Sequence, residues 1–287
     1  MTRAAVVVVV HDTRDDLLQC LASLAGAGAD DVVVVDSGSS DGSLEAAAEA
    51  APEATLLRLP NVGFGRAANA GVAATDADVV VLANADTRFF AGTVTALTAF
   101  LDERPEVGAV GPLIRFPDGR LQMSARSFPS LTQALGHGLL GFVWPANPWT
   151  RAYRLTDWDH RSERTVDWLS GSCIALRRTA FDGAHGFDPA YFMFVEDVDL
   201  CARLADAGWL VVFSPAAEVV HAIGGSVSRK RFRMTVEHAR SLDRFFGRRY
   251  AVGPRRALRP AIRVGLVGWV AAAVAWSAVR GRTHGHA

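Results

Sequence analysis

The sequence has few cysteines: Cys20, Cys173 and Cys201 are the only three among 287 residues. Their odd number and wide spacing predict neither a disulfide framework nor a zinc site. Hydrophobic residues make up 50% and charged residues 21% of the chain, which is atypical of a disordered or collagen-like protein. A chain of this length can bury a substantial core without cross-links, and its thiols fit a reducing cytosol best.

The sequence also has no long apolar segment at its start. The first apolar run, Ala4 to Val10, is short and leads directly into His11 and Asp12. A signal peptide needs a longer apolar core and a small-residue cleavage site. We therefore interpret this run as a buried strand.

The whole chain lacks a net charge, since it has 30 basic and 30 acidic side chains. These charges are, however, unevenly distributed along the sequence. Residues 1–225 carry 16 basic and 28 acidic side chains, residues 226–263 carry 12 and 2, and the last 24 residues add two arginines. A basic block this dense predicts an anionic partner, which is either nucleic acid or a membrane surface.

The segment after the basic block favours the membrane. Val264 to Val279 is sixteen residues without a charge and contains Trp269 and Trp276. It is slightly short of the roughly 20 residues that span a bilayer, but it is long enough to insert at the interface or to cross a thin region. The alternative is a terminal helix that packs on the domain or on a second subunit of a homo-oligomer.

Up to about residue 112, Val-rich runs alternate with Ala- and Leu-rich helical patterns, which is typical of βαβ units and a parallel sheet. We expect strands at residues 4–10, 32–35, 55–59, 79–83 and 107–111. The intervening helices should begin near Asp15, Ser43, Arg66 and Thr93. Ligands collect at the carboxyl ends of such strands, so the candidate site comprises the polar residues there, namely His11 and Asp12, Asp36, 61–66 and 84–86.

After residue 112 the pattern becomes less regular. Residues 113–116 and 121–124 flank Pro117-Asp118-Gly119 and predict a hairpin, and residues 127–165 predict a long loop region. The remaining expected elements are a strand over 166–176 interrupted at 170–172, a helix over 197–207, and strands over 210–214 and 218–221.

Asp36 ends the second expected strand, in the segment VVVVDSGSSDG. A carboxylate there can accept hydrogen bonds from a nucleobase imide or a ribose hydroxyl, while the small residues after it let a ligand approach the backbone. For Asp41 we prefer a capping role at the next helix. No GxGxxG follows the first strand, so dinucleotide binding is not supported.

Asn84 and Asp86 follow the fourth expected strand, in the segment VVVLANADT. Their oxygens suit a hard divalent cation such as Mg²⁺ or Mn²⁺ that bridges a diphosphate. A structural Asx turn would use the same residues.

Glu196, Asp197 and Asp199 lie within four residues at an expected helix start, after four large apolar residues. A helix N-terminus explains one carboxylate by capping and a second by the helix dipole. Crowded, partly desolvated carboxylates raise one another's pKa, which suits a general base. We therefore predict that Asp197 is catalytic, with structural capping as the alternative.

Arg66 and His221 are weaker candidates when each is considered alone. Arg66 could meet a phosphate at the mouth of the sheet, but it would be equally ordinary as a solvated arginine at a helix start. His221 ends the expected strand over 218–221, and a lone histidine is more often a core or surface residue than a ligand.

Seven motifs, taken in order, resemble those of an inverting family 2 glycosyltransferase with the GT-A fold, and most closely its bacterial rhamnosyltransferase-like branch, which builds cell-envelope polysaccharides. They are VVVVVHDTRDDL, VVVVDSGSSDG, NVGFGRAANAG, VVLANADT, WLSGSCIALRR, GFDPAYFMFVEDVDLCARL and VVFSPAAEVVH. The resemblance covers roughly residues 4–225. It implies an α/β fold with a mixed, mainly parallel sheet flanked by helices, a nucleotide-sugar half over 1–112 and an acceptor half over 113–225. The basic segment and apolar tail, 226–287, lie outside it.

The resemblance also implies roles for matched residues. Asp197 would be the catalytic base, and Asp86 and His221 would be metal ligands. The donor and acceptor contacts would come from His11, Asp12, Asp36, Arg66, Asn69, Asn84, Trp168, Ser170, Gly171 and Glu196. Two motifs depart from the pattern, since relatives often have Tyr-Asn where this chain has His11-Asp12, and Asn-Pro-Asp at 84–86 where this chain has Asn-Ala-Asp.

The resulting hypothesis is a metal-dependent, inverting sugar transferase at the cytoplasmic face of the cell membrane. Its expected donor is dTDP-rhamnose, its expected acceptor is a polyprenyl-diphosphate-linked saccharide, and its expected cofactor is Mg²⁺ or Mn²⁺. The alternatives are a galactofuranosyl or other hexosyl transferase that uses a UDP-sugar, and a non-catalytic member that binds a nucleotide sugar. We expect no nucleic acid partner, because Phe232, Phe245 and Phe246 fit helix packing better than base stacking.

Overall fold

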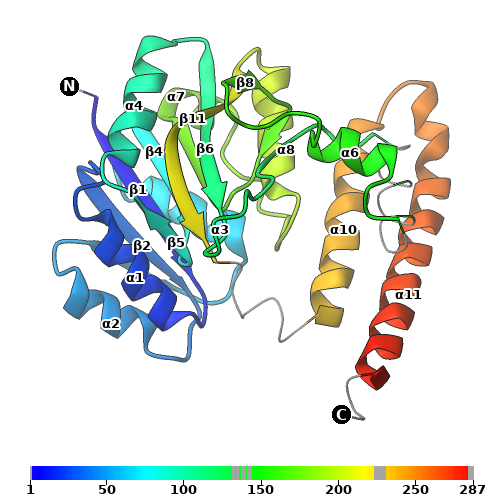
Figure 1. Cartoon of the computed structure of the whole chain (residues 1–287), viewed down its shortest axis with the longest axis horizontal. Helices are drawn as coiled ribbons and strands as arrows, with labels where there is room; N and C mark the ends of the chain where they lie inside the picture. Colours follow the sequence, from blue (N-terminus) through cyan, green and yellow to red (C-terminus); the bar gives the residue numbers. More distant parts are fainter. Residues whose placement is uncertain are drawn as a thin grey trace.

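The computed structural model describes residues 2–130, 144–222 and 231–283, together with positions 133, 136 and 140. Residues 226–230, at the start of the predicted basic segment, therefore lie outside the described residues. In the described part, nine strands form one sheet in the order β3-β2-β1-β4-β10-β6-β11-β5, with β8 paired to β11 (Figure 1). A separate two-stranded sheet joins β7 to β9.

The first half of the chain supplies the parallel part of the sheet. Its strands are β1 (Ala4–Val10), β2 (Asp31–Ser37), β3 (Thr55–Leu59) and β4 (Val79–Asn84). β1 pairs in parallel with both β2 and β4, and β2 pairs in parallel with β3. β-branched residues favour strands that are buried on both faces, so the valine runs form this core. The carboxyl ends of these strands therefore meet at one edge.

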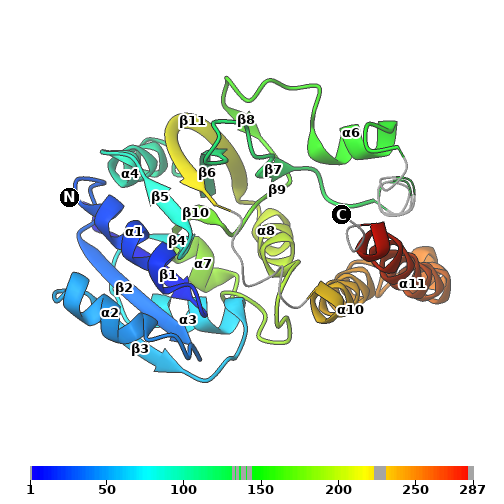
Figure 2. The ribbon, with the colours of Figure 1, turned by 60° about the horizontal axis from the view of Figure 1, so that its bottom comes forward.

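Helices cover both faces of the sheet, as Figure 2 shows. On one face, α1 (Arg14–Leu24), α2 (Ser43–Ala50) and α4 (Thr93–Glu103) bury Leu17, Ala47 and Leu97 against the valines of β1 and β4. On the other face the core is covered by α3 (Phe64–Ala73), α7 (Arg178–Gly183) and α8 (Glu196–Asp206). The predicted mainly parallel α/β fold is confirmed.

The second half of the sheet contains strands of both directions. These strands are β5 (Thr87–Phe89), β6 (Val107–Arg115), β10 (Cys173–Arg177) and β11 (Leu210–His221). β6 and β11 pair in parallel, whereas β5 runs antiparallel to β11. β10 runs antiparallel to β4 and β6. The amino end of β10 therefore lies at the same edge as the carboxyl end of β4.

Three expectations for this half need correction. The predicted strand over 121–124 is reduced to a single bridge between Arg115 and Leu121, although the expected turn is present. The two strands predicted at 210–214 and 218–221 are one strand, β11, with a register shift between Ser214 and Glu218. The predicted loop region 127–165 contains the helix α6 (Pro148–Arg154) and the short strand β8 (Arg164–Thr165).

The interrupted strand predicted over 166–176 separates into two elements. β9 (Trp168–Leu169) pairs with β7 (Ala125–Arg126), whereas β10 joins the main sheet. The break at Ser170-Gly171-Ser172 is where the chain passes from one sheet to the other.

The C-terminal part is a pair of helices, α10 (Arg231–Arg249) and α11 (Arg259–Thr283), joined through the 3₁₀ helix η2 (Pro254–Leu258). The two helices lie side by side (Figures 1 and 2). Arg263 Nε donates to Asp243 Oδ1 over 3.0 Å, and the rings of His238 and Trp269 are 5.4 Å apart. Within the residues described, no helix combines the length and the apolar character that crossing a bilayer requires.

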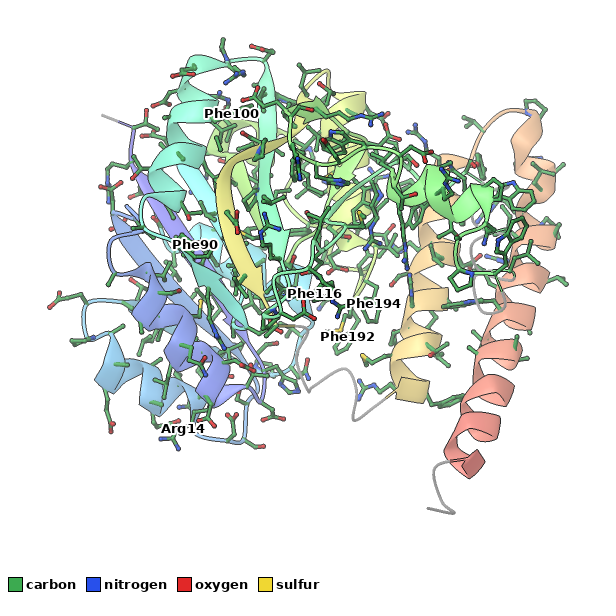
Figure 3. All side chains as sticks on the ribbon, viewed as in Figure 1. Arg14, Phe90, Phe100, Phe116, Phe192 and Phe194 are labelled. Atoms are coloured by element: carbon green, nitrogen blue, oxygen red, sulfur yellow. The ribbon has the colours of Figure 1, made fainter. Side chains whose placement is uncertain are left out.

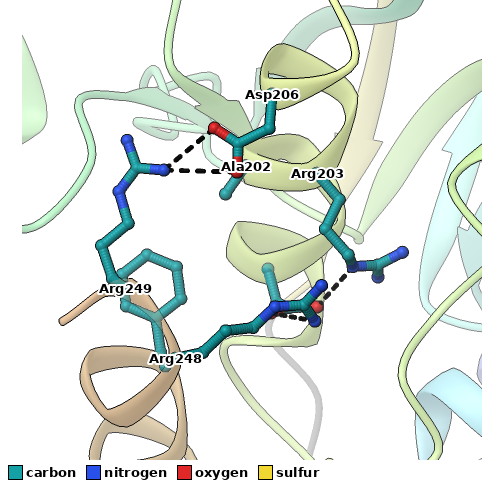
Figure 4. Close-up of a pocket in the computed structure, with 7 residues that line it drawn as sticks. Ala202, Arg203, Asp206, Arg248 and Arg249 are labelled. Carbon is teal, nitrogen blue, oxygen red and sulfur yellow. Dashed lines mark hydrogen bonds and ion pairs between the residues drawn. The ribbon is translucent and has the colours of Figure 1, made fainter. Parts of the chain in front are cut away.

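α10 attaches to the body through buried aromatics and ion pairs. Phe245, Phe246 and Tyr250 are buried. Figure 4 shows the charged part of the contact, around a small cavity of about 130 Å³ between α8 and α10. There Arg249 pairs with Asp206, and Arg248 pairs with Asp199. The basic character of this helix is therefore partly neutralised by the body on which it packs.

Candidate active site

A cavity of about 490 Å³ opens at the carboxyl edge of the parallel strands. Its wall comes from the ends of β1, β2 and β4, the turn before β10, the start of α8 and one side of α10. Ten of the thirteen residues predicted for the site line it: His11, Asp12, Asn84, Asp86, Trp168, Ser170, Gly171, Glu196, Asp197 and His221. Residues that are up to 210 positions apart in the chain are thus brought to one place.

The turn before β10 fixes the floor of the cavity. Asn84 N–H donates to Ser172 O over 3.1 Å, and Thr87 Oγ1 donates to the same oxygen over 2.9 Å. Ser170 and Ser172 share a hydrogen bond of 3.0 Å between their hydroxyls. The residues of β4 that carry the predicted metal motif are thereby tied to the predicted acceptor wall.

At the end of β1, His11 and Asp12 are held by the residues that follow β2. His11 Nδ1 lies 2.9 Å from Ser37 O. Ser40 N–H donates to Asp12 Oδ1 over 2.8 Å, and this backbone hydrogen bond is the main cause that lowers the pKa of Asp12. Asp12 has φ 52°, a conformation that turns the chain back toward the cavity.

Three predicted substrate contacts lie outside the cavity lining. Asp36 is 2% exposed, and its Oδ1 accepts the N–H of Ser39 over 2.8 Å. Arg66 Nε donates to Pro189 O over 2.6 Å, while Asn69 exchanges hydrogen bonds with the backbone of Phe187. These side chains shape the turn after β2 and the loop that precedes α8, and their contact with substrate stays a prediction.

Asp86 and His221 face each other at the donor side of the cavity. His221 Nε2 lies 3.0 Å from Asp86 Oδ1, and both side chains are about nine-tenths buried. Gln122 Oε1 lies 3.1 Å from His221 Nδ1, and Asn84 Nδ2 lies 3.3 Å from Nε2. If Nδ1–H donates to Gln122, the Nε2 lone pair points at a carboxylate oxygen, and a cation can satisfy both.

This pair fits a divalent ion that takes its remaining ligands from a diphosphate and water. In the described part of the chain, three or more His, Cys, Asp or Glu side chains do not gather into a metal cluster. Mg²⁺ is usually bound by one or two carboxylates together with substrate phosphates, and carboxylate and water oxygens also suit Mn²⁺. A site with few protein ligands is therefore what a substrate-borne metal needs.

Asp197 lies at the start of α8 and lines the cavity. Its Oδ2 accepts Gly171 N–H over 3.0 Å, and its Oδ1 accepts Val198 N–H over 2.8 Å. Burial raises the pKa of Asp197, while the bonds from Gly171 and Val198 act to lower it. The carboxylate is only partly covered, so an acceptor hydroxyl in the cavity can reach it.

Asp199, the third carboxylate of this cluster, is structural. It is 1% exposed. Its oxygens accept from Arg203 Nε over 2.8 Å and from Tyr191 Oη over 3.3 Å. Its charge is therefore matched by the body and by α10, and it faces away from the cavity, which it does not line.

Several residues of the site were not predicted from the sequence. Arg126 lines the cavity, with its guanidinium 5.0 Å from the ring centroid of Trp168. α10 contributes Arg233, Met234 and His238. The basic charge of residues 226–263 is the sequence signal for these residues, although it favours contact with a membrane surface over contact with the active site.

The mixed sheet with helices on both faces is the GT-A fold. Mannosyltransferase PcManGT from Pyrobaculum calidifontis, solved with GDP-Man and Mn²⁺, superposes with a TM-score of 0.59 at 20% identity, over 97% of this chain and 75% of that one. GalNAc-T7, solved with UDP, GalNAc and Mn²⁺, gives a TM-score of 0.60 at 15% identity, over 98% of this chain and 58% of that one.

The chain belongs to glycosyl transferase family 2, whose family model matches residues 5–183. It is 42% identical over 272 residues to the N-acetylglucosaminyl-diphospho-decaprenol L-rhamnosyltransferase of Mycobacterium tuberculosis. The aligned residues cover 90% of this chain and 88% of the relative. Rhamnosyltransferase WbbL of Escherichia coli K12 is 33% identical over 135 residues, or 46% of this chain and 47% of the relative. The predicted family and the predicted enzyme class are confirmed.

Glu196 gives the site a measurable pH dependence. Burial first, and then the adjacent Asp197, raise the pKa of Glu196 from its usual 4.5 to about 8. Its Oε2 is buried and has no hydrogen-bond partner among the described residues. Between pH 4.5 and about pH 8, Glu196 holds a proton in the folded protein that it has lost in the unfolded chain. The free energy of unfolding should therefore fall as pH rises through this window, by up to about 1.4 kcal/mol per pH unit.

We expect Glu196→Gln to remove this slope, because glutamine does not ionise. Urea unfolding at about pH 5 and about pH 8 measures it, and the wild type should lose more stability between the two values than the variant. Glu49→Gln, at an exposed position of α2, is the matched control and should keep the wild-type slope. Parallel losses in wild type and Glu196→Gln would contradict the raised pKa.

Proposed function

We propose that this glycosyltransferase transfers rhamnose from dTDP-rhamnose to a lipid-linked saccharide, with inversion at the anomeric carbon. The observation that carries the proposal is the position of Asp197, held by Gly171 N–H in one cavity containing the Asp86 and His221 pair. The sugar and the acceptor class follow the 42% identical relative, whose name specifies a diphospho-decaprenol-linked N-acetylglucosamine and L-rhamnose.

In the proposed reaction, Asp197 acts as the general base. Its carboxylate takes the proton of the acceptor hydroxyl as that oxygen attacks the anomeric carbon from the face opposite the nucleoside diphosphate. One bond forms to the acceptor oxygen, and the bond to the diphosphate oxygen breaks with its electron pair. The hydrogen bonds from Gly171 and Val198 orient the carboxylate, which is how positioning lowers the barrier.

We propose Asp86 and His221 as the protein ligands of a Mg²⁺ or Mn²⁺ ion. When bound, such an ion would offset the negative charge that develops on the departing diphosphate. Gln122 lies beside Nδ1 of His221 and would orient the imidazole, as partners of metal-binding histidines generally do. The assignment uses only residues that already lie together.

We also propose that η2 and α11 hold the enzyme at the cytoplasmic surface of the membrane. Leu258, Val264 and Val267 expose 41%, 73% and 71% of their surface. Apolar side chains among basic ones suit a helix that lies at a lipid interface, where each basic residue contributes about 1 kcal/mol. A lipid-linked acceptor would be met there.

Deleting residues 254–287 should release the protein from membranes, because it removes the exposed apolar side chains and four of the basic ones at 255–263. The measurement is the fraction that sediments with salt-washed membranes. A truncated protein that sediments like the full chain would contradict attachment through this segment.

A panel of donors tests the reaction. We expect release of nucleoside diphosphate to be fastest with dTDP-rhamnose, in the presence of a polyprenyl-diphosphate-linked N-acetylglucosamine and Mn²⁺. Release should stop after exhaustive chelation and return when Mn²⁺ is added. A faster reaction with UDP-galactofuranose or another UDP-hexose would replace the rhamnose assignment, and activity unchanged by chelation would remove Asp86 and His221 from the metal role.

The base is tested by Asp197→Asn, which keeps the acceptor for Gly171 N–H but cannot take a proton. Turnover should fall by about 10²- to 10⁴-fold, while donor affinity measured by calorimetry stays near the wild-type value. Asp206→Asn, in the last turn of the same helix and paired with Arg249, should keep its turnover. Near-normal turnover in Asp197→Asn would refute the role of Asp197.

A further inference from the structure

The acceptor side of the cavity combines an apolar wall with positive charge. Its apolar part comes from the loop before α8 and from α10, and it consists of Phe192, Phe194, Met234 and Leu242. Phe192 and Phe194 lie on the side of the body that faces α10 (Figure 3). Two arginines, Arg126 and Arg233, line the same cavity. A purely sugar-binding subsite has no need for this combination.

Arg126 is placed beside the reacting groups on the acceptor side. It pairs with Trp168 across the β7–β9 ladder. Its guanidinium lies 5.0 Å from the ring centroid of Trp168 and 5.6 Å from that of Tyr153, and Nε donates to Met123 O over 2.8 Å. A guanidinium whose face rests on aromatic rings keeps its other N–H groups available for an anion.

Arg233 differs from four other arginines of α10. Arg240, Arg244, Arg248 and Arg249 each pair with a carboxylate within 3.3 Å. Among the described side chains, Arg233 and Arg126 have no carboxylate within 4.0 Å. Arg233 instead lies over Phe192, with its guanidinium carbon 5.4 Å from the ring centroid. Its charge is therefore directed to the cavity and left uncompensated there.

The donor cannot account for these two arginines if transfer proceeds with inversion. The leaving diphosphate then lies opposite the attacking oxygen, so it lies away from Asp197 and toward Asp86 and His221. Arg126 belongs to the base side, through its stacking on Trp168. Arg126 also interacts electrostatically with Asp197, whereas Arg233 has no carboxylate within 4.0 Å among the described side chains. An anionic group carried by the acceptor would give both arginines a partner.

We propose that Arg126 and Arg233 bind the diphosphate of a lipid-linked acceptor, and that Phe192, Phe194 and Met234 contact the first carbons of its apolar chain. Arginine suits this task because its planar fork can bind phosphate oxygens in pairs. α10 is then part of the acceptor subsite. This assignment rests on the proposed transfer to a lipid-linked saccharide and names the residues that recognise its diphosphate.

Binding of farnesyl diphosphate to the full-length chain tests the subsite without turnover. Calorimetry should show that Arg233→Gln weakens this binding by about 10- to 100-fold, the range expected for lost hydrogen bonds to a charged group. Arg240→Gln makes the same charge change on the same helix, at an exposed position paired with Glu237, and should bind like the wild type. Farnesol should bind equally to all three proteins.

The other outcomes show whether Arg233 and the apolar wall each contribute to binding. Equal affinity of wild type and Arg233→Gln for farnesyl diphosphate would overturn the assignment, and so would an equal loss in Arg240→Gln. Inorganic diphosphate should bind more weakly than farnesyl diphosphate, and equal affinities would exclude the apolar wall from the subsite.

Kinetics then separate this inference from the proposed function. In Arg233→Gln the KM for a diphosphate-linked acceptor should rise by about 10- to 100-fold, while the KM for the donor and for a phosphate-free alkyl glycoside acceptor should stay unchanged. Equal increases for both acceptors would overturn the contact with the diphosphate. Wild-type enzyme that binds farnesyl diphosphate but transfers no rhamnose would refute the proposed reaction and leave the subsite standing.

Discussion

The contact between Gly63 and the carbonyl group of Phe192 holds the two halves of the active site together. A Cβ atom at Gly63 would lie 2.1 Å from that oxygen, so a side chain there would force the two segments apart. Gly63 has φ 87°, which residues with a side chain rarely adopt. Because the backbones approach so closely, Phe64 N–H reaches Phe192 O at 3.1 Å. The loop before α8 is thereby fixed to the start of α3.

This fixed loop explains how a strained turn can precede Asp197, the proposed base. Phe194 and Val195 have φ 66° and 68°, and such conformations cost on the order of 1–3 kcal/mol each. Ser241 Oγ donates to Met193 O over 3.0 Å, and Val195 is buried. These contacts hold the turn in place. Glu196 and Asp197, the next two residues, both line the cavity, with Glu196 buried and Asp197 partly exposed.

Sequence patterns predicted the parallel half well because its signals are local. Runs of valine define β1, β2 and β4 to within two residues at either end, and the residues that follow β1 and β4 line the cavity as expected. Short elements such as β5, with three residues, have too few positions for a periodic pattern. β11 was divided in two because Pro215 interrupts its pattern, whereas the strand absorbs the irregularity as a register shift.

The site was predictable where its residues follow strands and less predictable where tertiary packing decides. Asp36 and Arg66 occupy the right edge of the sheet, but their hydrogen bonds are with the protein backbone. Arg126 gave no local signal, since its place depends on a two-residue ladder with Trp168. The division of the chain at residue 225 separated α10 from a cavity that it lines, and that division stays a prediction.

Part of the positive charge of α10 is paired with negative charge on the body. Arg244, Arg248 and Arg249 reach Asp188, Asp199 and Asp206, which all belong to the acidic body. Charges matched in this way no longer attract a distant anion. Arginines of α10 thus differ in their contacts. These three hold the helix on the body, whereas Arg233 has no carboxylate partner among the described side chains and lines the cavity. The physical consequence is that charge density along the sequence indicated an anionic partner, but only the pairing of each arginine identifies where that partner can bind.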